Sequence, residues 1–433
     1  MKYRSLHPNL RIRIVVGAVQ RFLNIMVLPL VTLFLAARFG VTAAGLMMLT
    51  IALMEVAGTL VGGHFSDTYG RRPLLIAGET GVALSTALMA LAASSWLNSP
   101  ILIYAGFALA SFSTAMALPA NDAMIVDVTD SDVRKFVYTI NYWAINLALA
   151  CGVILGGFLY AGYFAYLLLA VAIGSLAVLA VTVVKISETA PAIEAAEGAG
   201  AYLKGFVQGY RLVLGNALFA ALLLAATLRM ALEVQINYFI NVRVSEGFPQ
   251  QTLFTIGSWA ARVTGVEILG ILRAENTLLV VVLALVVLGT LKRLNDRFRL
   301  YVGVGLFTLG TIVMAISNSG WILLAAMLVL TIGELLNVPV QQAMLADLVP
   351  ERSRTRYMAI FNLNVRLALL IASIGLAVGP WLKSAGMAVV YAAMGVVIVF
   401  SYRFVLNGMR RPAPAVPDQR PGTELREAAE PAQ

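Results

Sequence analysis

Ionisable side chains inside long apolar runs are the residues of this chain that can do chemistry. Glu55, Glu233 and Glu334 lie in such runs, and so do two arginines, Arg21 and Arg229. A charged side chain at the centre of a bilayer costs about 3 kcal/mol, so these groups are expected to face protein or water and to pair. A carboxylate that meets water and an arginine in turn can take up and release a proton. The sequence therefore predicts Glu334, Glu55 and Glu233 as proton-coupling groups.

Spacing along the chain sets the depth of two of these carboxylates. Glu55 stands twelve residues before Asp67, and Glu334 stands thirteen residues before Asp347. At a helical rise of about 1.5 Å per residue, both lie roughly 18 to 20 Å from the cytoplasmic boundary. That depth is close to the midplane of a hydrocarbon core about 30 Å thick.

The other charged residues in these runs have more than one explanation. Arg229 and Glu233 are four residues apart and can pair along one helix face, either as a static bridge or as part of a coupling network. Glu334 has no opposite charge within a turn on its own helix, which favours a functional role. Glu79, two turns into its helix, is expected to reach the cytoplasmic surface or the basic loops.

A substrate cavity is expected where polar and aromatic side chains share these helices. Tyr142 and Trp143 can contact a flat or cationic apolar molecule. For any single ring, however, packing between helices or against lipid is the better explanation. The residues predicted to line the cavity are Arg21, Asn141, Tyr142, Trp143, Asn146, Arg229, Asn237 and Asn337.

The composition identifies the class of protein that must position these groups. Of the 433 residues, 60% are hydrophobic and 12% are charged, whereas soluble proteins carry about a quarter charged residues. Runs of roughly 20 apolar residues, each long enough to span a bilayer, can be counted twelve times. The sequence thus predicts an all-α polytopic membrane protein. The helices are expected near 12–36, 43–66, 73–95, 100–127, 136–160, 163–184, 208–242, 276–292, 300–317, 320–347, 357–379 and 386–406.

The basic residues indicate orientation and not a nucleic-acid partner. The formal charge is +9, but Lys and Arg gather in the loops of one side, which predicts that both termini are cytoplasmic. With one cysteine, Cys151, no intramolecular disulfide can form. Two histidines beside that cysteine make a metal site improbable, and neither a metal nor a cofactor is expected.

An internal repeat divides the chain into two halves. Residues 119–127 (PANDAMIVD) match residues 339–347 (PVQQAMLAD) at an offset of 220. Two such repeats packed about an axis normal to the membrane place a substrate cavity at their interface. The expected organisation is a six-helix bundle over 1–184, a cytoplasmic linker over 185–207, a second six-helix bundle over 208–409 and a disordered tail over 410–433.

A short polar loop between the second and third apolar runs resembles the signature of the major facilitator superfamily. The loop reads GHFSDTYGRR over residues 63–72, although Thr68 stands where that family usually has a basic residue. An ordinary basic cytoplasmic turn is the alternative. The resemblance implies a cytoplasmic gate in which Asp67 pairs with an arginine or caps a helix. The gate residues would be Gly63, Asp67, Gly70, Arg71, Arg72 and Asp127.

Other stretches resemble the bacterial twelve-helix multidrug/proton antiporter branch of that family. Gly152, Gly156 and Gly157 are similar to its glycine motif, with Val153 in place of proline; they also suit close helix packing, which is common in membrane helices. Residues 121–147 and 331–348 resemble the same branch, and the likeness implies drug and proton binding at Glu334. Asn141 and Gln235 stand where the branch has carboxylates, so its proton stoichiometry does not transfer.

These observations predict a secondary active transporter and not an enzyme. It would export amphipathic or cationic drugs against protons by alternating access in the bacterial inner membrane, as a monomer whose partners are the substrate, protons and lipid. The alternative is a carrier for a sugar, an amino acid or a lipid-linked metabolite. A cavity crowded with hydrogen-bonding side chains would favour that carrier, and one rich in aromatic residues and Met would favour drug export. A membrane enzyme or sensor is disfavoured because no nucleophile with its base is apparent.

Overall fold

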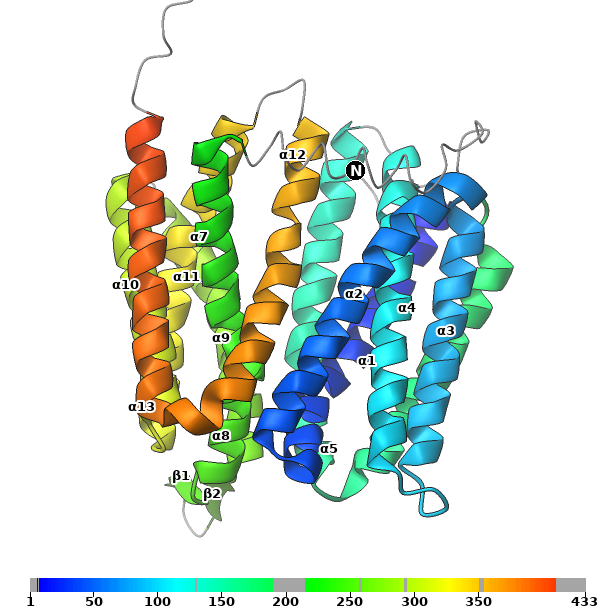
Figure 1. Cartoon of the computed structure of the whole chain (residues 1–433), viewed down its shortest axis with the longest axis horizontal. Coiled ribbons are helices and arrows are strands. Elements are labelled where there is room, and N and C mark those ends of the chain that lie inside the picture. The colour runs from blue at the N-terminus through cyan, green and yellow to red at the C-terminus, as the bar shows by residue number, and fades with distance from the viewer. Residues whose placement is uncertain are drawn as a thin grey trace, which may run out of the picture.

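The chain folds into a bundle of long helices that run side by side (Figure 1). The computed structural model describes residues 6, 8–128, 131–189, 215–256, 259–291, 294–349 and 354–409. The first half of the chain forms five helices: α1 (Pro8–Phe39), α2 (Val41–Tyr69), α3 (Arg71–Ala92), α4 (Pro100–Asp127) and α5 (Ser131–Lys185).

The second half of the chain adds helices and one short hairpin. Its elements are α7 (Ala217–Val234), the 3-10 turn η2 (Gln235–Asn237), α8 (Phe239–Gly247), β1 (Gln251–Ile256), β2 (Trp259–Val263), α9 (Gly265–Leu291), α10 (Asp296–Ile316), α11 (Gly320–Leu348), α12 (Arg354–Phe361) and α13 (Leu363–Gly408). The strands pair antiparallel, with Gln251 opposite Val263.

The described helices account for twelve passes through a membrane. Nine segments are long and apolar enough to cross, among them one from Gly162 to Lys185 and one over all of α13. The first part of α5 makes a separate pass, because the backbone turns at Gly162, where φ is 110°. In the same way α13 divides at Lys383, whose φ of 57° is not helical. α9 is a further pass, so these three passes and the nine segments make twelve. The fold is therefore all-α and polytopic, as predicted.

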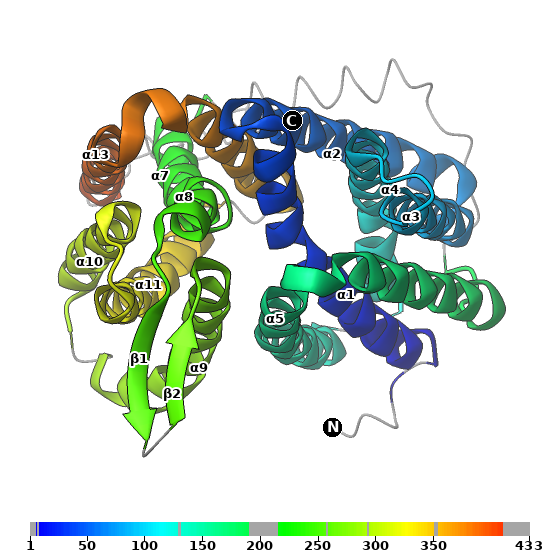
Figure 2. The same cartoon turned by 90° about the horizontal axis from the view of Figure 1, so that it is seen from below.

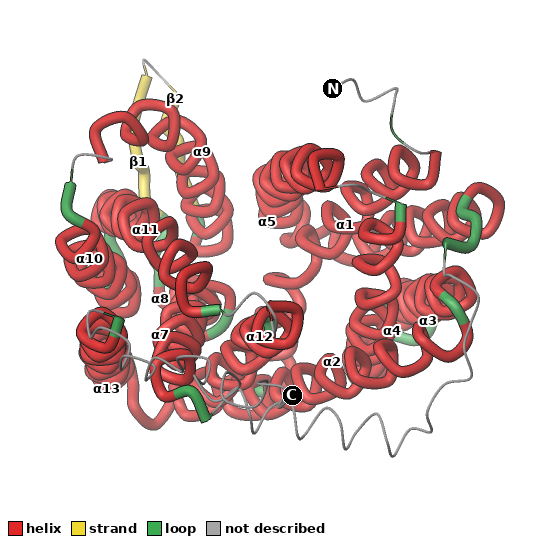
Figure 3. Tube along the Cα trace, turned by 90° about the horizontal axis from the view of Figure 1, so that it is seen from above, coloured by secondary structure: helices red, strands yellow, loops and turns green. Residues whose placement is uncertain are grey.

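The helices gather into two groups that meet along a central seam (Figures 2 and 3). Helices α1 to α5 form one group and α7 to α13 the other, and α2 contacts α13 while α5 contacts α9 across the seam. One apolar core lies within the second group. Another lies mainly in the first group but includes Tyr238, Val242, Ala372 and Leu376 from the second. Apolar side chains of the two halves therefore pack together, and in a membrane such packing favours association through van der Waals contacts.

The halves are in close contact at the end that carries the hairpin, opposite the start of α1 and the end of α13 (Figure 1). A Cβ atom added to Gly45 of α2 would lie 2.3 Å from the backbone nitrogen of Ala377 in α13. Nearby, the Asn241 side chain of α8 donates a hydrogen bond of 2.9 Å to the carbonyl oxygen of Pro29 in α1. Backbones of the two halves thus touch directly at this end, and glycine at position 45 makes the contact possible.

The eighth pass begins earlier than the sequence suggested. A long loop was expected between Arg243 and Glu275, but α9 begins at Gly265 and the hairpin occupies most of the remaining stretch. The Glu267 carboxylate accepts hydrogen bonds from the backbone nitrogen and the hydroxyl of Thr264, at 2.7 and 2.9 Å. This capping box starts the helix. The seventh pass, expected to run unbroken over 208–242, is interrupted by η2, and residues 208–214 lie outside the described residues.

Candidate functional site at the interface of the two halves

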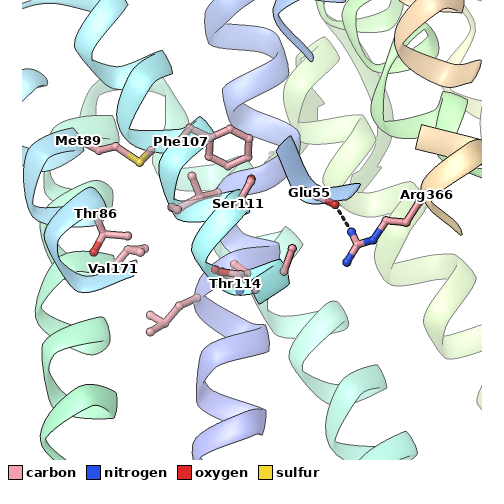
Figure 4. Close-up of a pocket in the computed structure, with 13 residues that line it drawn as sticks. Glu55, Thr86, Met89, Phe107, Ser111, Thr114, Val171 and Arg366 are labelled. Carbon is pink, nitrogen blue, oxygen red and sulfur yellow. Dashed lines mark hydrogen bonds and ion pairs between the residues drawn. The ribbon is translucent and has the colours of Figure 1, made fainter. Parts of the chain in front are cut away.

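An ion pair joins the halves close to the middle of the bundle. Glu55 projects from α2 and Arg366 from α13, and their side chains form a direct charge-assisted hydrogen bond (Figure 4). Both side chains are largely buried, with exposed fractions of 18% and 19%. Removing either partner would leave an uncompensated charge in a poorly hydrated place, which is strongly unfavourable. The pair therefore couples the state of one carboxylate to the contact between the halves.

A cavity of about 140 Å³ lies beside this ion pair (Figure 4). Hydroxyl, amide and carboxylate oxygens contribute the smaller part of its wall, through Thr86, Ser111, Thr114, Asn24 and Glu55. The apolar part of the lining is Leu23, Val27, Met89, Phe107, Ala110, Ala115 and Val171, and Arg366 completes it. The wall thus comes from helices α1 to α5 and from α13, with a negative and a positive group at one side.

A second network of charges lies inside the C-terminal half. Arg229 Nη1 on α7 donates to Glu233 Oε2 at 3.0 Å. Arg273 Nη2 on α9 donates to Asn237 Oδ1 at 2.7 Å. Both arginines interact electrostatically with Glu233 and with Glu334 of α11. Two positive and two negative groups therefore balance one another around this site.

Asn276 fixes the position of the carboxylate on α11. Its Nδ2 atom lies 3.4 Å from Glu334 Oε2 and donates at 2.9 Å to the Thr331 hydroxyl. Sequence reasoning missed Arg273 and Asn276 as site residues, because it placed them outside or at the first turn of a helix. The signal that would have found them is the Thr264-x-x-Glu267 pattern, which moves the helix start back by about three turns.

The polar loop between α2 and α3 contacts the segment that follows α5. The Glu188 carboxylate accepts hydrogen bonds from the backbone nitrogens of Arg71 and Arg72, at 3.1 and 2.9 Å. The Arg72 side chain donates to the carbonyl oxygens of Ile186 and Val183, at 2.7 and 2.9 Å. A carboxylate at a helix N-terminus satisfies free N–H groups and complements the helix dipole. Glu188 therefore caps α3, a role that the sequence did not reveal.

Other residues of the predicted gate lie around this cap. Gly70 has a φ of 96°, a left-handed conformation that glycine adopts at little cost. Arg71 Nε lies 3.6 Å from Asp127 Oδ2 at the end of α4. Gly63 lies in the last turns of α2. The side chain of Asp67 lies outside the described residues, so its predicted pairing stays a prediction. Thr68 bonds its hydroxyl to the His64 carbonyl oxygen at 2.9 Å.

Two of the predicted packing glycines lie against α1. A Cβ atom on Gly152 would be 3.1 Å from the Phe22 carbonyl oxygen, and one on Gly156 would be 2.4 Å from that of Met26. The backbones of α5 and α1 therefore approach closely here. Gly157 lies in α5, but its surroundings and the side chains of Asn141, Tyr142, Trp143 and Asn146 are outside the part of the structure that is described.

The remaining candidates lie in different places. Arg21 is exposed and interacts electrostatically with Asp122 of α4. Asn337 is fully buried and donates to the Gly333 carbonyl oxygen of its own helix at 2.8 Å. Glu79 does not reach the surface as expected, since it is only 2% exposed and accepts a hydrogen bond from Gln20.

Two bundles of membrane-spanning helices, with an ion pair and a small cavity where they meet, are the architecture of a polytopic membrane transporter. The sequence profile of the Major Facilitator Superfamily matches residues 14–372 and 268–432 in two overlapping segments. The chain therefore belongs to this superfamily, and the resemblance drawn from the polar loop is confirmed. It is a transporter and not an enzyme.

Known proteins are similar over most of the chain. A Na(+), Li(+), K(+)/H(+) antiporter of Planococcus maritimus is 29% identical over 414 residues, which cover 94% of this chain and 98% of that protein. The class C tetracycline resistance protein of Escherichia coli is 26% identical over 317 residues, 71% of this chain and 72% of that protein. The structure of a POT family transporter in complex with 5-aminolevulinic acid superposes with a TM-score of 0.74 at 14% identity, covering 95% of this chain and all of that one.

Proposed function

We propose that this transporter is an antiporter that exchanges protons for a cation by alternating access. The observation that carries the proposal is the Glu55–Arg366 ion pair beside the cavity between the halves. A proton and a cationic substrate both need the negative charge of Glu55. Because one carboxylate cannot satisfy both, binding of one favours release of the other, and this competition is the basis of exchange.

The same carboxylate links binding to the movement of the halves. When Glu55 takes up a proton, Arg366 loses its counter-charge and the bond across the seam weakens. When a cation occupies the cavity, Glu55 is again drawn away from Arg366. Either event changes the relative stability of the two arrangements of the halves, which is how a ligand shifts a conformational equilibrium.

Alkali metal cations are the first substrates of this proposal. The cavity of about 140 Å³ is smaller than the roughly 300 to 1,000 Å³ typical of sites for drug-sized ligands. Its hydroxyl, amide and carboxylate oxygens are the ligands that hard cations prefer. The relative that matches almost the full length of this chain is named as a Na(+), Li(+), K(+)/H(+) antiporter.

Export of amphipathic cationic drugs is the second candidate. Phe107 and Met89 in the cavity wall can pack against an apolar cation. The similarity to a tetracycline resistance protein supports the same substrate class. Under this function, Glu55 and the C-terminal carboxylates Glu233 and Glu334 serve as proton-coupling groups.

The proposal places the protein in the bacterial inner membrane with both termini in the cytoplasm. Arg71, Arg72 and the other loop arginines on the side of the termini support this orientation. A monomer suffices, because one chain supplies the whole cavity wall and both partners of the ion pair. The proposed division is a bundle over 1–184, a linker over 185–207, a bundle over 208–409 and a tail over 410–433.

Proton and cation exchange can be measured in proteoliposomes. With an acidic interior reported by a pH-sensitive dye, addition of Na⁺, Li⁺ or K⁺ outside is expected to release protons, while choline is expected to have no effect. Tetraphenylphosphonium is added in parallel to test the second candidate. Glu55→Gln should abolish the exchange, because the competing charge is gone.

A matched control is Glu246→Gln, since Glu246 is exposed near the end of α8. This variant is expected to exchange as the wild type does. If none of the cations released protons from wild-type vesicles, or if Glu55→Gln exchanged normally, the proposal would be refuted.

A further inference from the structure

A separate group of charged and polar side chains lies inside the N-terminal half. Arg13 stands five residues into α1, Glu79 eight residues into α3, and Asp122 five residues before the end of α4. At about 1.5 Å per residue these positions are roughly 8 to 12 Å from the helix ends on the side of the termini. The group is therefore distinct from the cavity that contains Glu55.

Glu79 is the most deeply buried carboxylate of this group. It is 2% exposed, and Gln20 Nε2 donates to its Oε2 atom at 2.8 Å. Arg13 of α1 is the charged residue that acts on it. Helices α2, α4 and α5 also pack against α3, and in the described part of the chain they bring no further charge to bear on Glu79. A carboxylate so placed must be either compensated by Arg13 or neutralised by a proton.

Arg13 connects this carboxylate to the groups on α4. The Arg13 Nη2 atom hydrogen bonds to Asn121 Oδ1, and Asp122 is the next residue of α4. Asp122 interacts electrostatically with both Arg13 and the exposed Arg21. A series of electrostatic interactions thus links buried Glu79 to Arg21 through Arg13 and Asp122.

A small cavity along this series has room for a ligand that accepts hydrogen bonds. Its volume is about 30 Å³, and its polar lining is Arg13, Arg21 and Asn121. Arg13 is only 6% exposed, and its Nε and Nη1 atoms have no hydrogen-bond partner in the part of the chain that is described. Buried donors of this kind nearly always have an acceptor. A single water molecule needs about 10 to 15 Å³ and fits here.

We propose that Glu79, buried and hydrogen bonded to Gln20, is a second proton-binding group of this transporter. A hydronium ion from the side of the termini gives its proton to a carboxylate oxygen of Glu79 and leaves as water. The role of this step in exchange rests on the function proposed above.

Proton binding at Glu79 redistributes charge along the series. Neutral Glu79 no longer balances Arg13, so Asp122 becomes the remaining counter-charge of Arg13. Asp122 is then drawn away from Arg21. The positive charge of Arg21 at the exposed face of α1 is no longer compensated by Asp122. A proton taken up inside the N-terminal half thereby changes the charge presented by that half.

Infrared difference spectroscopy tests this proposal without relying on transport. The purified full-length protein is titrated with acid, and the carbonyl band of each newly protonated carboxyl group is recorded. Glu79→Gln is expected to lose one band at the frequency of a buried carboxyl group. Glu246→Gln, the exposed control, should retain that band. Gln20→Leu removes the hydrogen-bond donor to Glu79 and should move the pH midpoint of the band while keeping its intensity.

A second measurement assigns the band to the exchange cycle. In proteoliposomes, Glu79→Gln should still move cations but with fewer protons per cation than the wild type. Identical acid titrations of the wild type and Glu79→Gln would overturn the proposal. An unchanged pH midpoint of the band in Gln20→Leu would also overturn it. The Gln20→Leu result decides the question if Glu79→Gln does not fold. A wild type that exchanges no cation would refute the proposed function and leave the infrared result to stand.

Discussion

Charge balance within the C-terminal half depends on single residues. Arg273 and Arg229 together face Glu233 and Glu334, so Arg273→Met would leave two carboxylates against one arginine. Removing one partner of a buried charge network costs on the order of 3 kcal/mol. We expect a clear fall in the thermal unfolding midpoint of Arg273→Met, measured in detergent. The exposed Arg403→Met serves as the matched control and should unfold like the wild type.

A compensating substitution makes this prediction specific. Glu334→Gln restores the balance of charge in Arg273→Met, so the double variant should be more stable than Arg273→Met alone. The coupling free energy from the double-mutant cycle is expected to be about 1 to 3 kcal/mol. Additive effects of the two substitutions would contradict the network.

At the scale of elements, the sequence predicted the helices better than the contacts between them. Apolar runs and the polar loop that contains Gly70 are local features, and the class, the twelve passes and the family followed from such features. The Glu55–Arg366 pair joins residues 311 apart. Helices that are apolar on all sides give no periodicity from which their facing sides can be deduced, so this contact could not be predicted.

The cap on α3 illustrates the same limit in a loop. The predicted linker over 185–207 includes Glu188, and the sequence offered Asp67 as either an arginine partner or a helix cap. The structure places the Glu188 carboxylate on the amides of Arg71 and Arg72. Its distance of 116 residues from Arg72 hides the contact from any local pattern.

This cap leads to a prediction about α3. Glu188→Ala removes two hydrogen bonds to the first amides of the helix, and loss of such a cap costs about 0.5 to 2 kcal/mol. We expect faster hydrogen exchange at the amides of Arg71 and Arg72, measured by mass spectrometry, while the Glu246→Ala control exchanges like the wild type. Unchanged protection of these amides in Glu188→Ala would show that the cap contributes nothing.

At the scale of the whole molecule, the contact between Gly45 and Ala377 holds the halves together at the end opposite the termini. Any side chain at position 45 meets the backbone of α13 at 2.3 Å, and a backbone segment cannot move aside as a side chain can. Gly45→Leu should therefore separate the halves at this end and favour the arrangement in which the cavity opens there. Gly305→Leu is the matched control, because a Cβ atom at Gly305 meets no atom within 4 Å.

Spin labels on the two halves measure this change directly. With Cys151 replaced, cysteines are introduced at Trp96 in the N-terminal half, which is 90% exposed, and at exposed Glu246 in the C-terminal half. The distance between the labels should increase in Gly45→Leu and stay unchanged in Gly305→Leu. Because opening at one end requires closure at the other in alternating access, a pair of labels on the side of the termini should move closer together in the same variant. Distances that remain at the wild-type values at both ends would mean that the Gly45 contact does not control the arrangement of the halves.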